Sequence, residues 1–112
     1  MPIRSDDYNQ VCVLGVEGDL SGDNAVSLRQ AAEEKINNKQ IADFVVDLEK
    51  CSFMDSEGLE TLLWLKRRAE DLFGQVKLVC IDDNCKKILE ITRLASRFEC
   101  QNDLAAALKT MN

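Results

Sequence analysis

Apolar and polar residues alternate along the chain with two different periods. Three short apolar runs have the pattern of strands covered on both faces, and they span residues 11–16, 44–48 and 76–81. Weaker runs at 3–6 and 97–100 predict two further strands, the second at a sheet edge. Apolar residues at three- and four-residue spacing predict four helices, within 25–36, 59–73, 88–91 and 104–111. Strands that alternate with helices predict an α/β domain with a parallel or mixed sheet.

Three loops follow the predicted central strands, at 17–23, 51–56 and 82–84. In a sheet of parallel strands, functional sites collect in the loops that leave the carboxyl ends of the strands. These loops contain no lysine or arginine, so we expect an acidic rim at that edge. The side chains that this places near one another are Asp19, Ser21, Asp55, Ser56 and Asp82.

Ser56 stands where a predicted strand and loop give way to a helical pattern. It lies between Asp55 and Glu57, and Gly58 follows. A serine at a helix N-terminus can cap the helix, because its hydroxyl can accept a hydrogen bond from a free backbone N–H group. A phosphate added at the same place would change the local charge sharply. The two roles are compatible, so Ser56 is predicted as a cap that can also act as a switch.

The sequence gives little support for an enzyme active site or a metal site. The chain has no histidine and no Gly-x-Ser-x-Gly elbow, so a nucleophilic serine would lack its base. Asp19, Ser21 and Asp23 begin like a calcium-binding loop, but Asn24 stands at the position of the turn glycine and Gln30 at that of the bidentate acid. We expect a solvated acidic loop, and neither a metal nor a cofactor.

The predicted helix over 59–73 carries the tryptophan of the chain. Its apolar side is predicted to hold Leu59, Leu62, Leu65, Ala69, Leu72 and Phe73. Trp64 falls on the other side, and its neighbours there are Glu60, Arg67, Arg68 and Asp71. A tryptophan among charged residues can lie flat on their aliphatic stems, or it can be a hot spot of a protein interface. The sequence leaves both open.

Length, charge and cysteine content narrow the class of protein. A chain of 112 residues fits a single domain over 1–112, and a net charge of −6 favours a partner with a basic face over nucleic acid. No apolar run reaches membrane-spanning length, and the N-terminus is unlike a signal peptide, so we expect a cytoplasmic protein. Five cysteines without a Cys-x-x-Cys pair predict reduced, buried thiols and no zinc site.

The stretch 46–59, Val-Asp-Leu-Glu-Lys-Cys-Ser-Phe-Met-Asp-Ser-Glu-Gly-Leu, resembles the signature of bacterial anti-sigma factor antagonists. These are stand-alone STAS domains, and the resemblance extends over nearly the whole chain, through Gly18-x-Leu20 and the strand pattern at 76–80. It implies the STAS fold, an α/β domain with a mixed, mostly parallel sheet of four to five strands. About four helices are expected, packed mainly on one side of that sheet.

The same resemblance implies a function and its partners. In the family, an anti-sigma factor that is also a serine kinase phosphorylates the serine that corresponds to Ser56. The unphosphorylated domain binds that kinase and releases a sigma factor, and a serine phosphatase reverses the modification. This chain departs from the pattern in two places. Glu57 stands where a second hydroxyl residue is common, and Ser21 stands where many members carry aspartate.

The sequence therefore predicts a monomeric, phospho-switchable binding module with no catalytic residues. The residues expected to contact the partner around Ser56 are Asp19, Ser21, Asp23, Asp55, Glu57, Gly58, Glu60, Leu63, Trp64 and Arg67. An alternative is a constitutive STAS scaffold, or a subunit of a transport complex, that does not use Ser56 as a switch. An enzyme is the third and least supported class.

Overall fold

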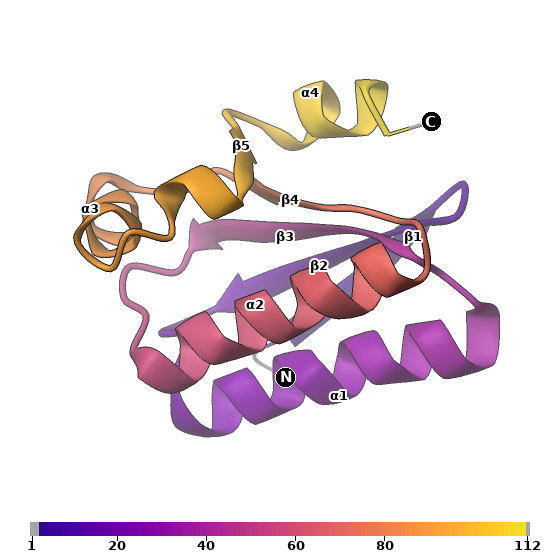
Figure 1. Ribbon diagram of the computed structural model, residues 1–112, viewed down its shortest axis with the longest axis horizontal. Helices are drawn as coiled ribbons and strands as arrows, with labels where there is room; N and C mark the ends of the chain where they lie inside the picture. The colour runs from indigo at the N-terminus through magenta and orange to yellow at the C-terminus, as the bar shows by residue number, and fades with distance from the viewer. Residues whose placement is uncertain (1–2, 112) are drawn as a thin grey trace.

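The computed structural model describes residues 3–111 as a five-stranded sheet in the order β1-β2-β3-β4-β5 (Figure 1). The strands are β1 (Ile3–Tyr8), β2 (Val11–Glu17), β3 (Asp43–Lys50), β4 (Val76–Val79) and β5 (Glu99–Gln101). The helices are α1 (Gly22–Lys39), α2 (Ser56–Asp71), α3 (Asp83–Ile91) and α4 (Leu104–Lys109), with a 3₁₀ turn at Ala95–Arg97. β1 pairs with β2 antiparallel, and the other pairings are parallel. The mixed, mostly parallel α/β sheet of the STAS fold is confirmed.

Helices cover the sheet unequally on its two faces. On one face α1, α2 and α3 bury the larger core, to which the sheet contributes Cys12, Leu14, Phe44, Val46 and Leu78 among others. On the other face α4 packs Ala107 against valines of the central strands, which are Val11, Val13, Val45 and Val79. β2, β3 and β4 are therefore buried on both sides, which explains why their sequences are mostly apolar. No helix among residues 3–111 has the length and apolar character that crossing a bilayer would need.

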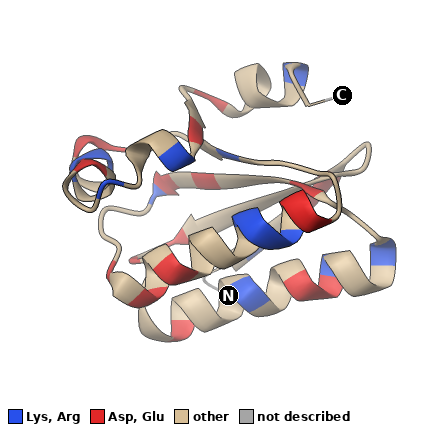
Figure 2. Ribbon diagram, in the orientation of Figure 1, with Lys and Arg blue, Asp and Glu red and all other residues tan. Residues whose placement is uncertain are grey.

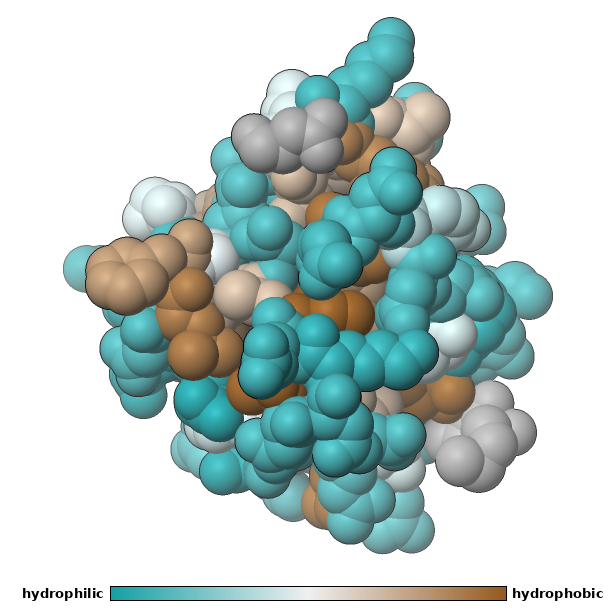
Figure 3. All heavy atoms as spheres, turned by 90° about the vertical axis from the view of Figure 1, so that its right-hand side faces the viewer, coloured by the Kyte–Doolittle hydropathy of each residue, from teal (hydrophilic) through white to brown (hydrophobic). Residues whose placement is uncertain are grey.

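The C-terminal end of α2 corrects one prediction. The helix stops at Asp71, and Phe73 takes the left-handed φ of 63° that a glycine usually supplies at this place. Gly74 instead occupies the next position, where an added Cβ would lie 1.9 Å from the Ala42 carbonyl oxygen. Phe73 consequently points into solvent with 99% exposure, so its predicted place on the apolar side is wrong. This end of the molecule is otherwise a mostly hydrophilic surface broken by apolar side chains (Figure 3).

The cysteines are free thiols, as predicted, but they differ in burial. Cys12, Cys51 and Cys85 are buried, Cys80 is half-buried and Cys100 is exposed. Burial raises the pKa of the Cys12 thiol to about 11, and it also raises the pKa of the Cys85 thiol. Buried thiols of this kind stay protonated at neutral pH and behave as small apolar side chains.

Two lysines form ion pairs that tie separate elements together. Lys77 is 2% exposed on the face that α4 covers, and its ammonium donates to the Thr110 hydroxyl and lies 3.0 Å from a Glu99 carboxylate oxygen. Lys35 of α1 lies 3.0 Å from the Asp7 carboxylate of β1. A buried ammonium needs such partners, because its desolvation is otherwise costly.

Acid is expected to weaken the fold through these two pairs. Hydrogen bonds from Lys35 and Lys77 lower the pKa values of Asp7 and Glu99 from their usual 3.8 and 4.5. The folded chain thus binds these protons less readily than the unfolded chain. The stabilisation is complete above about pH 5 and is lost as the pH falls through the lowered pKa values. Urea unfolding midpoints measured from about pH 6 to pH 3 should fall. A double variant, Asp7→Asn with Glu99→Gln, should fall less, and an equally steep fall would contradict the assignment.

Candidate functional site

The loop between β3 and α2 is joined to the loop that precedes α1. Leu20 and Met54 form an isolated parallel bridge, in which the Leu20 amide donates to the Phe53 carbonyl at 2.9 Å. The Asp55 amide donates in turn to the Leu20 carbonyl at 3.4 Å. The backbone thus brings together two of the three loops that were expected to meet at the carboxyl ends of the strands.

The third loop is attached from the other side. The Asn84 side-chain amide donates to the Ser52 carbonyl at 2.6 Å. Two buried thiols donate as well, Cys85 to the Cys51 carbonyl at 3.4 Å and Cys51 to the Phe53 carbonyl at 3.3 Å. Sequence reasoning placed Asn84 in a turn only and missed this contact, because nothing in the local pattern links residues 32 positions apart. The loop before α2 is therefore held on both sides.

Asp55, and not Ser56, caps α2. The Asp55 carboxylate accepts a hydrogen bond from the Gly58 amide at 3.0 Å, and Ser56 is the first residue of the helix. The predicted cap was wrong by one residue, because aspartate and serine are equally good caps and stand side by side. Ser56 is exposed, and its hydroxyl forms no hydrogen bond with residues 3–111. The hydroxyl is consequently free for a partner or a modifying enzyme.

Replacing Asp55 by alanine should cost about 1 kcal/mol of unfolding free energy, the usual loss for an N-cap. Ser56→Ala is the matched control one residue away, and it should change stability by less than about 0.5 kcal/mol. Urea denaturation measures both. A larger cost for Ser56→Ala than for Asp55→Ala would show that the serine is the cap after all.

Gly58 is required by packing and not by its backbone angles. A Cβ at this position would lie 2.0 Å from the Leu20 carbonyl oxygen, far inside contact distance. The first turn of α2 therefore sits directly on the loop that contains Leu20. The glycine allows the bridge between the two loops and the start of α2 to form together.

The acidic rim is present around this point. Asp19 and Asp23 are exposed, and Ser21 is half-buried at the N-cap position of α1, where its side chain makes no capping bond. Asp82 caps α3 by accepting from the Cys85 amide at 2.8 Å. Acidic residues also lie along the first turns of α2, whereas its second half holds three basic residues followed by two acidic ones (Figure 2). Among the described residues, no three acidic or cysteine side chains are placed to hold a metal ion.

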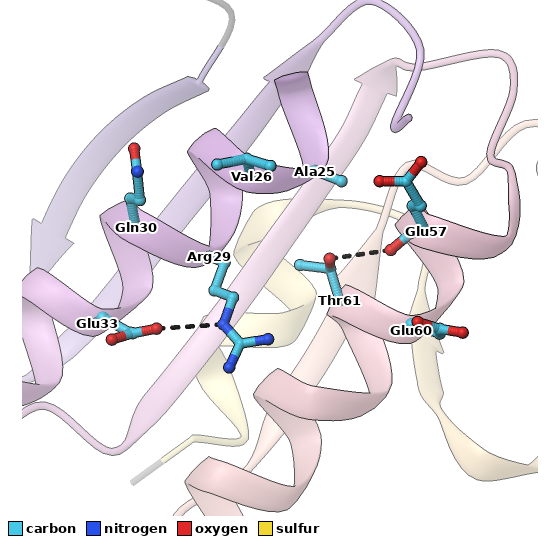
Figure 4. Close-up of a pocket in the computed structure, with 8 residues that line it drawn as sticks. All are labelled: Ala25, Val26, Arg29, Gln30, Glu33, Glu57, Glu60 and Thr61. Atoms are coloured by element: carbon cyan, nitrogen blue, oxygen red, sulfur yellow. Dashed lines mark hydrogen bonds and ion pairs between the residues drawn. The ribbon is translucent and has the colours of Figure 1, made fainter. Parts of the chain in front are cut away.

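A groove of about 640 Å³ lies between α1 and α2, beside the start of α2 (Figure 4). Thr61 is buried in it and donates its hydroxyl to the Glu57 carbonyl at 2.9 Å, and Val26 is half exposed. Its charged side chains are Arg29 and Glu33 from α1 and Glu57 and Glu60 from α2. The sequence predicted the two α2 residues as partner-binding but did not single out those of α1, because it cannot show which two helices are neighbours.

Trp64 lies beside this groove, and its predicted place apart from the core is wrong. Its ring is half-buried and packs against the larger core. The Arg29 guanidinium carbon lies 4.4 Å from the ring centroid, a cation–π contact. The predicted contact with charged neighbours is thus made across to α1 and not along α2. Of the other predicted contact residues on α2, Glu60 and Arg67 are exposed, whereas Leu63 is half-buried.

Comparisons with known proteins agree on one family. Residues 3–107 match the family model described as the STAS domain. A candidate anti-sigma factor antagonist from Thermotoga maritima superposes with a TM-score of 0.89 at 16% identity, covering 97% of this chain and 93% of that one. An anti-sigma factor antagonist from Mycobacterium paratuberculosis gives 0.83 at 23%, covering 97% and 92%. The phosphorylated form of the Bacillus cell fate determinant SpoIIAA gives 0.75 at 18%, covering 96% and 97%. At these identities the structures share the fold.

Proposed function

The chain belongs to the STAS domain family, and from that membership we propose that it is an anti-sigma factor antagonist switched by phosphorylation of Ser56. In this proposal the unphosphorylated protein binds an anti-sigma factor that is also a serine kinase, and a sigma factor is released. A serine phosphatase restores the binding form. The observation that carries the proposal is the exposed Ser56 hydroxyl, which makes no hydrogen bond within residues 3–111 and directly follows a loop that is held on both sides.

The held loop favours a switch that acts on the partner and not on the fold. The backbone of residues 52–55 is fixed by Leu20, Asn84 and the Asp55 cap, and none of these contacts uses the Ser56 side chain. A phosphate at the start of α2 also gains from the helix dipole. Modified and unmodified protein should therefore unfold at similar temperatures.

A phosphate on Ser56 would be poorly placed inside an interface. It would carry nearly two negative charges beside Asp55 and Glu57, and residues 51–60 contain no lysine or arginine to neutralise them. Burying such a group against a partner costs desolvation energy that no cation on this segment offsets. The added bulk would also push apart the surfaces that were in contact at the hydroxyl. Loss of partner binding follows from both effects.

One observation favours the alternative of a constitutive scaffold. Glu57 is exposed and places a permanent negative charge next to Ser56. A partner that tolerates this charge would be less sensitive to another one beside it.

The test compares three variants in binding to a purified anti-sigma factor of the serine-kinase type from the organism that produces this chain. Ser56→Ala should bind like the wild type, and Ser56→Glu should bind much more weakly. Ser52→Glu is the matched control, since it adds the same charge to an exposed serine of the same loop. Phosphoserine at Ser56 in protein isolated from its native cells would support the switch directly. Equal binding by Ser56→Ala and Ser56→Glu would leave the scaffold as the better description.

A further inference from the structure

Some of the charged side chains in the groove between α1 and α2 pair with each other, and the others have no ion-pair partner. Arg29 is engaged twice, because its Nε lies 3.2 Å from the Glu33 carboxylate and its guanidinium stacks on Trp64. The carboxylates of Glu57 and Glu60 form no ion pair with any residue in 3–111. The α2 wall of the groove is thus negative near the start of the helix, and the α1 wall holds one fixed cation farther along (Figure 4).

The groove also offers apolar surface next to these charges. Val26 on the α1 wall is 50% exposed, and Ala25 and Thr61 form the bottom without an unsatisfied polar group. At the end where Ala25 and Val26 lie, the groove is lined by Glu57, the residue that follows Ser56 in α2 (Figure 4). A segment lying in the groove would be in contact with the surface proposed above to bind the partner.

We propose that this groove docks a segment of the partner protein that presents an arginine beside an apolar side chain. Glu57 and Glu60 are one helical turn apart, with Cβ atoms about 5–6 Å from each other. A planar guanidinium has donors on several edges and can bridge two carboxylates at that spacing, which an ammonium does less well. The apolar side chain would cover Val26. Glu33 on the α1 wall is already paired with Arg29, so the unpaired carboxylates of the α2 wall are the ones that attract the arginine and set the register of the segment.

This inference rests on the proposed function only in taking the start of α2 as a partner surface. The surface would then perform two separate tasks, the recognition of the partner and the switching of binding. The groove would decide which partner is recognised, through Glu57, the residue that stands where relatives commonly have a hydroxyl. Ser56 would decide whether binding occurs. A phosphate on Ser56 leaves the groove carboxylates in place, so recognition and switching can be tested apart.

The probe is the acetylated and amidated tripeptide Leu-Arg-Leu, with the citrulline peptide Leu-Cit-Leu as its neutral isostere. Binding is followed by the fluorescence of Trp64, the single tryptophan, and by amide NMR shifts. The arginine peptide should shift amides of α1 and of the first half of α2, and the citrulline peptide should not. The double variant Glu57→Gln/Glu60→Gln should weaken binding by about tenfold. Glu34→Gln, which removes an exposed charge from α1 outside the groove, should bind like the wild type.

Equal binding of the two peptides, or unchanged binding by the double variant, would overturn the proposal. So would equal weakening by Glu34→Gln, because that would indicate attraction by net charge alone. Ser56→Ala should bind the peptide normally. The peptide experiment can therefore fail while the kinase experiment succeeds, which would reject the groove and keep the switch at Ser56. If the peptide binds as expected but the kinase experiment fails, the groove is supported and the switch is rejected.

Discussion

Replacing Gly58 by alanine is expected to destabilise the protein by about 3 kcal/mol. The new Cβ would lie 2.0 Å from the Leu20 carbonyl oxygen and 3.0 Å from the Leu20 Cγ. The nearest atom belongs to the backbone and cannot rotate away, so either α2 or the Leu20 loop must move. Such a movement breaks the bridge between Leu20 and Met54 and the hydrogen bond from the Asp55 amide.

Intrinsic helix preference predicts the opposite sign, which makes the experiment decisive. Alanine in a helix is favoured over glycine by about 0.5–1 kcal/mol, so a Gly58 that merely sat in α2 would be improved by the change. Gly22 provides the control. It also starts a helix, its φ is 48°, and nothing lies within 4 Å of an added Cβ. Gly22→Ala should cost only the left-handed strain, about 1 kcal/mol. If urea unfolding gives Gly58→Ala a smaller loss than Gly22→Ala, close packing on Leu20 is not the reason for the glycine.

The bridge between Leu20 and Met54, which Gly58 permits, shows which features of the site the sequence predicts and which it does not. Burial on both faces leaves few polar residues in the strands at 11–16 and 44–48, so their sequences reflect contacts with the whole sheet. These apolar runs predicted where the strands end, and the loops that follow them lie where they were expected. The contacts that fix those loops are carried by the Leu20 backbone, by Asn84 and by two thiols. Each of these contacts ends on a backbone carbonyl, and backbone groups are the same in every residue, so no side-chain pattern identifies the acceptor.

The errors on α2 have a common physical origin. A helical projection assumes one buried side, but α2 packs on the sheet and also lies beside α1. Trp64 faces that second neighbour, which is why the projection places it away from the apolar side, among charged residues. The helical period predicts Phe73 on the apolar side because it continues past Asp71, where the helix ends. Both misassignments concern features that a local period does not contain, namely the helix beside α2 and the residue at which α2 ends.

Trp64→Ala is expected to cost about 2 kcal/mol of unfolding free energy, roughly half the loss for a fully buried aromatic side chain. The ring fills the space between α2 and α1, where it packs against the larger core and under the Arg29 guanidinium. Arg29→Ala should cost less than about 1 kcal/mol, because it removes only the cation–π contact and an exposed ion pair with Glu33. In the double variant the two losses should sum to more than the measured total, because the stacking between them is counted twice. Strict additivity in urea unfolding would argue against the stack.

The expected loss of stability in Trp64→Ala changes how the interface must be tested. A Trp64→Ala protein that fails to bind a partner would not identify a hot spot, because the wall of the groove that carries Glu60 and Thr61 rests on the same helix. Trp64→Phe keeps an aromatic face for Arg29 and most of the contact with the core, and it should lose less than about 1.5 kcal/mol. If Trp64 touches the partner itself, this variant should weaken binding by more than its loss of stability accounts for. If Trp64 only supports the groove, binding should track stability across the two Trp64 variants, and Glu57→Gln should weaken binding with no loss of stability.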